Sequence, residues 1–185
     1  MKFLTDLARE AKGLDLNKFT ARYPRAAFLL ANQGSTDVRE GKIDTPSQEG
    51  PGAETAVVMA TPLLPTAIKA PSPEDDDGTL VFFLTKSDRN PFSTMITIGR
   101  AKNNDIILEI PTVSKLHAYV IARGATNLIF DQGSRNGVTV DGHRLGASEG
   151  LPLVDGATIQ LAPGLALRYY SPSSLFGILA LKSRT

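Results

Sequence analysis

The sequence predicts an all-β protein, a sandwich of two antiparallel sheets, with a short N-terminal helix and a disordered acidic linker. From residue 80 onward, short apolar runs alternate with turn residues about every 8–12 positions, which is typical of a β-sandwich. Aromatic residues make up only 6% of the 185 residues and Trp is absent, while 16 Gly and 12 Pro are present. This composition favours a turn-rich fold over a helical bundle.

The first segment, residues 1–31, is expected to be helical. Apolar side chains recur there at three- and four-residue spacing, and Gly13 stands where a helix would stop. The segment holds six bases and three acids, and the amphipathic helix could dock on a domain or a partner. The apolar positions are Leu4, Leu7, Ala8, Ala11 and Leu14.

The next segment, residues 32–79, has the composition of a linker. It holds nine acids against three bases, together with six of the twelve prolines. Acidic, proline-rich sequence cannot bury enough apolar surface to offset the entropy of ordering, so we expect the segment to be mostly disordered.

The predicted domain covers residues 80–172, and residues 173–185 form a C-terminal helix or tail, with a helix expected at Leu175–Leu181. Asp141-Gly142, between Val140 and His143, is a strong hairpin signal. The candidate strands are Leu80–Leu84, Thr94–Ile98, Asp105–Leu108, His117–Ala122, Asn127–Phe130, Val138–Val140, Thr158–Leu161 and Leu165–Tyr170.

Several classes of site are excluded by composition. The absence of Cys excludes a disulfide framework, a thiolate zinc site, an iron–sulfur cluster and a thiol nucleophile. Neither a metal-ligand spacing nor a phosphate loop is present, so no metal and no cofactor is expected. No apolar run approaches the roughly 18 residues of a membrane span, and acids interrupt the N-terminus where a secretory signal would be apolar. We therefore expect a cytoplasmic protein.

Three polar clusters fall in three different loops of the predicted sandwich: Gly99-Arg100, Ser114 to His117, and Gly133 to Gly137. Loops at one end of a sandwich converge, so these residues can share a site. The clusters combine three cations with a hydroxyl and an amide, and Arg in particular matches phosphate oxygens two at a time. Such a site favours an anion. The residues between them, Lys102-Asn103-Asn104, are interpreted as exposed loop.

Order and spacing make the pattern specific, because five short motifs follow one another in register between residues 98 and 142. Residues from about 80 to 172 thereby resemble a forkhead-associated (FHA) domain of the bacterial type, a β-sandwich that binds phosphothreonine. The motifs are Ile98-Gly99-Arg100, Asn104-Asp105-Ile106, Ser114-x-x-His117, Asp131-x-Gly133-Ser134-x-Asn136-Gly137 and Val140-Asp141-Gly142.

The resemblance implies roles for individual residues. Arg100 and Ser114 correspond to residues that grip the phosphate, and Lys115 and Arg135 occupy flanking positions that often add phosphate contacts. Asn136 corresponds to a residue that hydrogen-bonds the ligand's main chain. Gly99, His117 and Gly137 correspond to structural residues that shape the loops. One departure from the family is Ala157, which follows Asp155-Gly156 where an acid is common; it lies in a turn far from the ligand loops.

Two other function classes were weighed. The pattern Gly146 to Gly150 matches a nucleophile elbow, but that motif needs a later His and His143 is the last one, so the chain is not expected to be an enzyme. A nucleic-acid-binding domain is the alternative suggested by the eleven bases and seven acids after residue 79, although the cations form no run and aromatic residues are sparse. A phospho-independent scaffold is a further alternative.

The linker contains a candidate phosphosite, Thr55, in Glu54-Thr55-Ala56-Val57-Val58. Phosphorylated Thr55 could occupy the chain's own binding site, a mode of regulation that occurs in small actinobacterial members of the family. Alternatively Thr55 is unmodified, and the apolar stretch Ala56–Ile68 adds a strand or docks on the core. The partners implied are phosphothreonine-containing proteins and a Ser/Thr protein kinase, with no nucleic acid and no membrane span.

Overall fold

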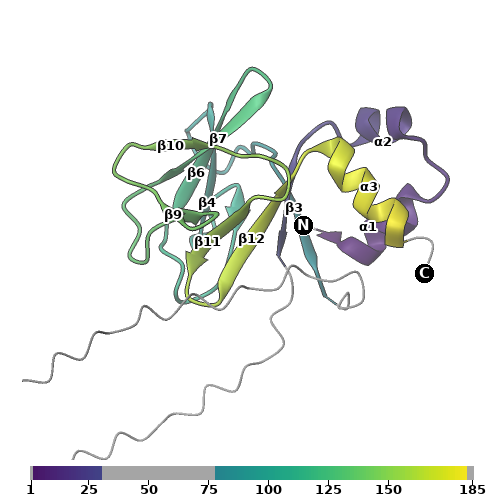
Figure 1. Ribbon diagram of the computed structural model, residues 1–185. Coiled ribbons are helices and arrows are strands. Elements are labelled where there is room, and N and C mark those ends of the chain that lie inside the picture. The colour runs from purple at the N-terminus through teal and green to yellow at the C-terminus, as the bar shows by residue number, and fades with distance from the viewer. Residues whose placement is uncertain (1, 31–77, 183–185) are drawn as a thin grey trace, which may run out of the picture. The chain divides into compact units, whose positions relative to one another are not determined.

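The computed structural model describes residues 2–30 and 78–182, which form two β-sheets and three helices (Figure 1). The 7-stranded sheet has the order β1-β3-β2-β12-β11-β8-β9, and the 5-stranded sheet has the order β10-β7-β6-β4-β5. All pairings are antiparallel except that between β4 and β5. The architecture is the predicted two-sheet sandwich.

The strands of the larger sheet are β1 (Lys2–Phe3), β3 (Leu80–Phe83), β2 (Ala27–Leu30), β12 (Leu165–Tyr170), β11 (Thr158–Ala162), β8 (Thr139–Val140) and β9 (His143–Arg144). Those of the smaller sheet are β10 (Gly150–Pro152), β7 (Thr126–Asp131), β6 (Ala118–Arg123), β4 (Met95–Gly99) and β5 (Ile106–Ile107). Each of the eight candidate strands overlaps an observed strand. Strands β1, β2, β9 and β10 were not among those predicted from the sequence.

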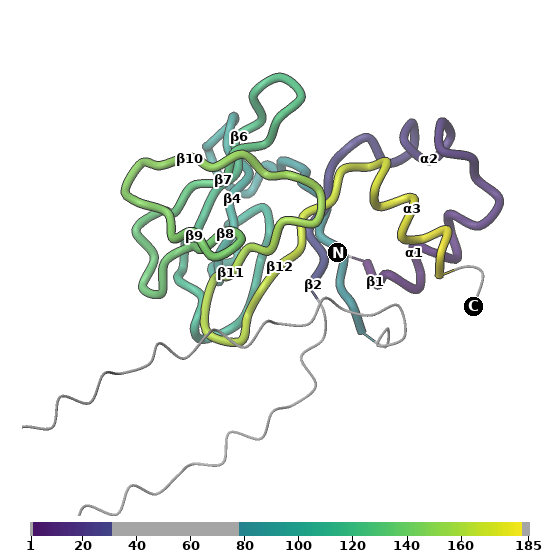
Figure 2. The backbone as a smooth tube through the Cα atoms, in the orientation of Figure 1, coloured from purple at the N-terminus to yellow at the C-terminus, as the bar shows by residue number. Residues whose placement is uncertain are grey.

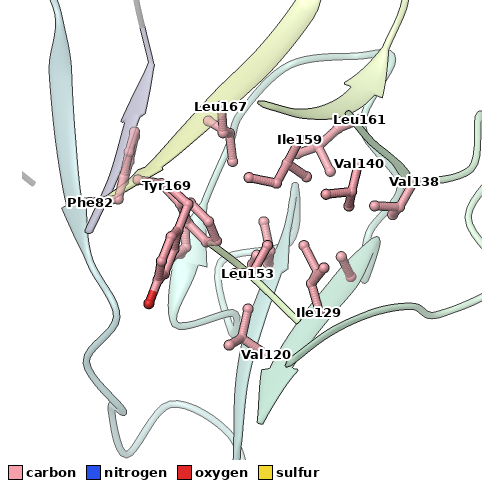
Figure 3. Close-up of a cluster of buried hydrophobic side chains, with 14 of the residues drawn as sticks. Phe82, Val120, Ile129, Val138, Val140, Leu153, Ile159, Leu161, Leu167 and Tyr169 are labelled. Atoms are coloured by element: carbon pink, nitrogen blue, oxygen red, sulfur yellow. The ribbon is translucent and has the colours of Figure 1, made fainter. Parts of the chain in front are cut away.

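The main core lies between the two sheets, where alternate residues of facing strands meet (Figure 3). Ile159 and Leu167 from the larger sheet and Val120 and Ile129 from the smaller one are all completely buried. The β8–β9 turn is the expected hairpin, and both of its central residues have positive φ, 47° at Asp141 and 87° at Gly142. That is the backbone geometry that matches the twist of a two-residue hairpin.

A second core covers the outer face of the larger sheet. Strand β2 sends Phe28 and Leu30 into the sandwich and Ala27 and Leu29 toward the helices, so all four of its residues are buried. The second core joins the outer faces of β2 and β3 to all three helices. Its buried members are Leu4, Leu7, Ala11, Phe19, Ala27, Leu29, Val81, Leu175 and Leu179.

The three helices begin and end where local signals favour it. Helix α1 (Leu4–Ala11) is followed by Gly13, whose φ of +86° lets the chain turn back. Helix α2 (Leu16–Arg22) is capped by Asp15, whose carboxylate accepts a hydrogen bond from the backbone N–H of Lys18 at 2.8 Å. Helix α3 (Pro172–Lys182) starts with proline, which suits the first helical position. Within the described ranges, no helix is long and apolar enough to cross a membrane.

The interpretation of residues 1–31 as a short helical segment needs correction. This stretch forms two helices and also two strands, and β2 pairs with both β3 and β12 inside the larger sheet. The tube in Figure 2 shows β2 entering the sheet beside β12. The folded unit therefore draws on the chain before residue 31 as well as after residue 77.

Most of the predicted linker, residues 32–77, lies outside the described residues. The same holds for the candidate phosphosite Thr55 and for the apolar stretch Ala56–Ile68. The regulatory role of Thr55 therefore stays a prediction from the sequence, as do the domain boundaries drawn at residues 31, 79 and 172.

Candidate functional site

Three loops meet at one end of the smaller sheet because of its strand register. Ile98 of β4 pairs with Ala118 of β6, and Ala118 pairs with Asp131 of β7. The loop after β4, the loop before β6 and the loop after β7 therefore leave the sheet at the same level. The hairpin between β6 and β7 projects from the other end (Figures 1 and 2). The convergence predicted for the three polar clusters is what the register produces.

Arg100, the first residue after β4, is held by the neighbouring loop. Its backbone N–H donates to the carbonyl of Ser114 at 2.9 Å, and its Nε donates to the carbonyl of Val113 at 3.2 Å. The side chain is exposed, and its terminal guanidinium nitrogens make no hydrogen bond or ion pair to any residue of the described ranges. The Nε–H group thus orients the guanidinium, and its terminal N–H groups are available to a ligand.

Ser114 connects the loop before β6 to the loop after β7. Its Oγ accepts a hydrogen bond from the backbone N–H of Arg135 at 3.1 Å, which leaves the hydroxyl hydrogen free to donate. Its own backbone N–H donates to Nδ1 of His117 at 3.1 Å. The Ser114 hydroxyl is therefore held in place with one donor still available.

A hollow of about 350 Å³ lies between these loops. Arg100, Lys115 and Arg135 line it and no Asp or Glu does, and the other lining residues are Pro111, Thr112, Val113 and Ser114. The side chains of Lys115 and Arg135 take part in no ion pair within the part of the chain that the structure describes. By contrast, Lys2, Arg9, Lys18, Arg22 and Lys86 are each within 4.0 Å of a carboxylate oxygen. The hollow therefore concentrates positive charge that the described side chains leave uncompensated.

Four of the five predicted ligand-binding residues line this hollow, and Asn136 lies beside it. The Asn136 Nδ2 donates to the carbonyl of Thr112 at 2.8 Å, so this amide ties the loop after β7 to the loop before β6. Asp131 contributes from the end of β7 by accepting a hydrogen bond from the backbone N–H of Ser134 at 3.1 Å. These contacts set the position of Arg135 between them.

The three predicted structural residues sit where close approach or a special backbone shape is required. A Cβ on Gly99 would lie 2.4 Å from the carbonyl oxygen of Lys115. Gly137 has a φ of +76°, and a Cβ there would lie 2.4 Å from the guanidinium of Arg144. His117 is completely buried, and its Nε2 lies 3.3 Å from the carbonyl oxygen of Gly137. Because Nδ1 accepts from Ser114, Nε2 is the nitrogen that carries the hydrogen of the neutral ring.

The interpretation of Asn104 as exposed loop is wrong. Asn104 is 2% exposed, and its Nδ2 donates to the carbonyls of Ala101 at 2.8 Å and Lys115 at 2.7 Å. The amide thus braces the loop after β4 against the loop before β6 at Lys115, which lines the hollow. Its place in the Asn104-Asp105-Ile106 motif could have indicated a structural role for Asn104. The polarity of its neighbours Lys102 and Asn103 indicated an exposed loop instead.

Asp105 provides a second brace that the sequence analysis missed. Its side chain is fully buried and accepts hydrogen bonds from Lys86 at 2.9 Å, from Ser87 and from Thr97. Burial alone would raise the pKa of Asp105, but these hydrogen bonds outweigh it and hold the pKa well below its usual value. The carboxylate therefore stays charged and anchors the segment before β4 to the start of β5.

Burial of His117 carries a pH dependence. Burial lowers the pKa of His117, against the opposing effects of its hydrogen bond to Gly137 and the charge of Asp131. The unfolded chain takes up a proton near pH 6.5, before the folded one does. We therefore expect the free energy of unfolding to be fully maintained above about pH 6.5 and to fall as the pH drops toward the lowered pKa.

Denaturant unfolding of the full chain between about pH 5 and pH 8 measures this loss. His143→Gln removes the only other histidine, which is exposed, and should leave the pH dependence in place. The ordinary pKa of an Asp side chain is near 3.8, and the pKa of Asp105 is lower still. Protonation of Asp105 therefore does not contribute to the change in stability between these pH values. An unchanged stability between about pH 7.5 and pH 5.5 in the wild type would contradict the assignment of His117 as a buried neutral ring.

No group of three or more His, Cys, Asp and Glu side chains within residues 2–30 and 78–182 is arranged to hold a metal ion. His143 and Glu149 pair at 2.8 Å; His143 is exposed and Glu149 is half-buried. What the arrangement at the hollow provides is positive charge, a hydroxyl donor and a rigid loop framework, which together suit an anion.

The FHA domain is the family whose sequence model matches this chain, over residues 96–162. This range contains all of the predicted ligand-binding residues and all three structural glycine and histidine positions. A comparison with curated proteins found no match.

Several solved structures are similar to part of the chain. EmbR of Mycobacterium tuberculosis, in complex with a low-affinity phosphopeptide, is 27% identical with a TM-score of 0.42, over 50% of this chain and 22% of EmbR. The Slr1951 protein of Synechocystis sp. is 28% identical with a TM-score of 0.42, over 51% of this chain and 85% of that one. The N-terminal FHA domain of S. cerevisiae Rad53p, in complex with a phosphothreonine peptide, is 20% identical with a TM-score of 0.43, over 53% of this chain and 89% of that one. This chain therefore spans about a fifth of the length of EmbR.

The family match agrees with the expectation that the chain is not an enzyme, because FHA domains are non-catalytic binding modules that recognise phosphothreonine peptides. The match covers the three loops whose convergence forms the hollow, the strands of the smaller sheet, and β8, β9 and β11 of the larger one. Residues 96–162 of this chain thus match the FHA domain in sequence, and they lie within a two-sheet sandwich that holds the hollow.

Proposed function

We propose that this chain is a non-enzymatic reader that binds phosphothreonine peptides at the hollow between the three loops. The observation that carries the proposal is the hollow's charge: three cations line it, none is paired with a described carboxylate, and a fixed hydroxyl lies among them. A phosphorylated side chain offers three acceptor oxygens and a charge of about −1.5 to −2 at neutral pH. It would satisfy the donors that the described residues leave unused.

Each residue has a distinct role in this proposal. Arg100 and Ser114 bind the phosphate oxygens, the first through the free end of its guanidinium and the second through its hydroxyl hydrogen. Lys115 and Arg135 add charge from either side of the hollow. Asn136 hydrogen-bonds the peptide main chain; because its amide already donates one hydrogen bond to Thr112, its carbonyl oxygen and second N–H are the groups available for a peptide.

The proposal places the chain in Ser/Thr kinase signalling, because a phosphothreonine exists only where such a kinase has acted. Its partners are then the kinase and the proteins that the kinase modifies. Regulation through a phosphorylated Thr55 is part of the same proposal and is supported by the sequence around that residue alone.

A nucleic-acid-binding function has less support from the same surface. Three unpaired cations gather in one hollow of about 350 Å³, whereas contacts to a phosphodiester backbone would follow an extended groove. Binding of a single phosphate group releases few counterions, so its affinity falls only slightly as the salt concentration is raised. Binding of a nucleic-acid duplex releases many counterions, so its affinity falls steeply. The salt dependence of binding distinguishes the two functions.

The test is a fluorescence-anisotropy screen of the full chain against a degenerate phosphothreonine peptide library, with phosphoserine and unphosphorylated libraries as controls. The full chain is needed because a fragment starting after the linker would lack β2, which lies between β3 and β12 in the larger sheet. We expect binding to the phosphothreonine library alone, with dissociation constants on the order of micromolar, about −8 kcal/mol. Equal binding of the unphosphorylated library would indicate a phospho-independent scaffold and would refute the proposal.

A further inference from the structure

A second hollow, of about 590 Å³, lies beside the first one. Arg100 and Pro111 line both hollows, so these two residues form the wall between them. The remaining lining residues of the second hollow are Ala101, Lys102 and Glu109. A ligand whose phosphate contacts Arg100 therefore has a neighbouring space on the other side of the same side chain.

The charged side chains of this second hollow are presented by anchored backbone. Ala101 donates its N–H to the carbonyl of Lys115 at 3.0 Å and accepts from the backbone N–H of Asn104 at 3.1 Å, so Lys102 lies in a turn held at both ends. On the opposite side, the N–H of Leu108 donates to the carbonyl of Gly99 at 2.9 Å, and Glu109 follows directly. Lys102 and Glu109 therefore both lie in segments that backbone hydrogen bonds hold in place.

Lys102 and Glu109 are exposed, and neither forms an ion pair with the other or with any residue in the described ranges. Arg100 already binds the phosphate in the proposed complex, so the charges of both hollows must be counted together. Arg100, Lys102, Lys115 and Arg135 are positive and Glu109 is negative. A phosphate charge of about −1.5 to −2 still leaves this surface net positive, which favours an anionic group.

We infer that the second hollow is a subsite for a second anionic side chain of the same phosphothreonine peptide, held by Lys102. The inference rests on the proposed function of the first hollow. The chemistry shared by the candidate ligands is a carboxylate or a second phosphate. Lys102 is thereby a specificity-determining residue, although its sequence context gave no reason to single it out.

Because the two hollows share Arg100 and Pro111, one extended peptide can cross from the first to the second. Side chains two positions apart lie on the same face of an extended strand, about 7 Å from each other. A peptide whose phosphothreonine occupies the first hollow can then place a neighbouring side chain past Arg100 into the second. The negative charge of Glu109 weakens the binding of an acidic side chain in the second hollow, so the preference for an acidic peptide residue is expected to be small.

The test starts from one phosphothreonine peptide that binds the full chain. In this peptide each position from three before to three after the phosphothreonine is changed singly to Ala, Asp or phosphoserine, and dissociation constants are measured by fluorescence anisotropy. We expect one position at which Asp binds about two- to fivefold more tightly than Ala, the range of a solvent-exposed ion pair. A larger gain with phosphoserine at that position would identify phosphate as the ligand, and an equal or smaller one the carboxylate.

Two charge-removing variants should move this preference in opposite directions. Lys102→Gln should reduce the ratio between the Asp and Ala peptides toward one, and Glu109→Gln should increase it. Lys12→Gln, which removes a lysine at the end of α1, is the matched control and should leave the ratio unchanged. None of the three substitutions alters the first hollow's cations.

The inference is overturned if no position prefers Asp, or if the preference is the same in the wild type, Lys102→Gln and Glu109→Gln. That result differs from a failure of the proposed function, in which no phosphothreonine peptide binds the wild type at all. A preference that depends on Lys115 in place of Lys102 would also overturn the inference, because it would place the acid in the first hollow.

Discussion

Replacing Arg100 with Ala should abolish recognition of phosphothreonine peptides without unfolding the protein. The Arg100 side chain is exposed and makes a single hydrogen bond, through Nε to the carbonyl of Val113, so its loss removes little from the folded state. In the proposed complex the guanidinium is paired with the phosphate, and truncating one member of such a charge pair costs about 2–5 kcal/mol of binding free energy. The expected loss of affinity is about 30-fold to several thousandfold.

The measurement is peptide binding by fluorescence anisotropy together with thermal unfolding of the same samples. Arg123→Ala serves as the matched control, since Arg123 is an exposed arginine at the β6–β7 hairpin, at the other end of the sheet. It removes the same charge and should keep wild-type affinity. Undiminished binding by a folded Arg100→Ala protein would show that the phosphate binds elsewhere.

Much of the fold could be predicted because the sandwich strands have one buried face. Strand β6 alternates buried and half-buried residues from Ala118 to Ile121, and such alternation is readable in the sequence. Strand β2 could not be recognised in the same way. Both of its faces are covered, by the sandwich on one side and by the helices on the other, so its run of four apolar residues has no period. Strands of two or three residues, such as β9 and β10, are too short for any period to be detected.

The site was predictable to a similar degree and for a related reason. The motif spacing that resembles FHA domains was enough to select Arg100, Ser114, Lys115 and Arg135 as candidates, and all four line the first hollow. The residues that hold the loops together were harder to find. Whether an amide such as Asn104 lies on the surface or beneath it depends on the carbonyls that approach it, and those come from a loop eleven residues away.

The close contact between these loops leads to the second prediction with a large effect, for Gly99→Ala. An added Cβ would lie 2.4 Å from the carbonyl oxygen of Lys115 and 2.9 Å from the Asn104 amide nitrogen, distances that side chains do not tolerate. The first contact is with backbone, so relief requires the two loops to separate. We expect a loss of about 1–3 kcal/mol in the free energy of unfolding, as for other overpacked sites. Peptide affinity should also fall, because separation moves Arg100 away from Ser114.

Gly177→Ala in α3 is the matched control for this prediction. Gly177 is exposed, and nothing lies within 4 Å of the position where its Cβ would be. Removing a glycine from a helix interior should stabilise the protein by about 0.5–1 kcal/mol and leave peptide affinity unchanged. The change from Gly to Ala is thus expected to lower the free energy of unfolding at position 99 and to raise it at position 177. A Gly99→Ala protein with wild-type stability and wild-type affinity would mean that the loops are not held at this distance, and the rigid framework assigned to the phosphate hollow would then have to be abandoned.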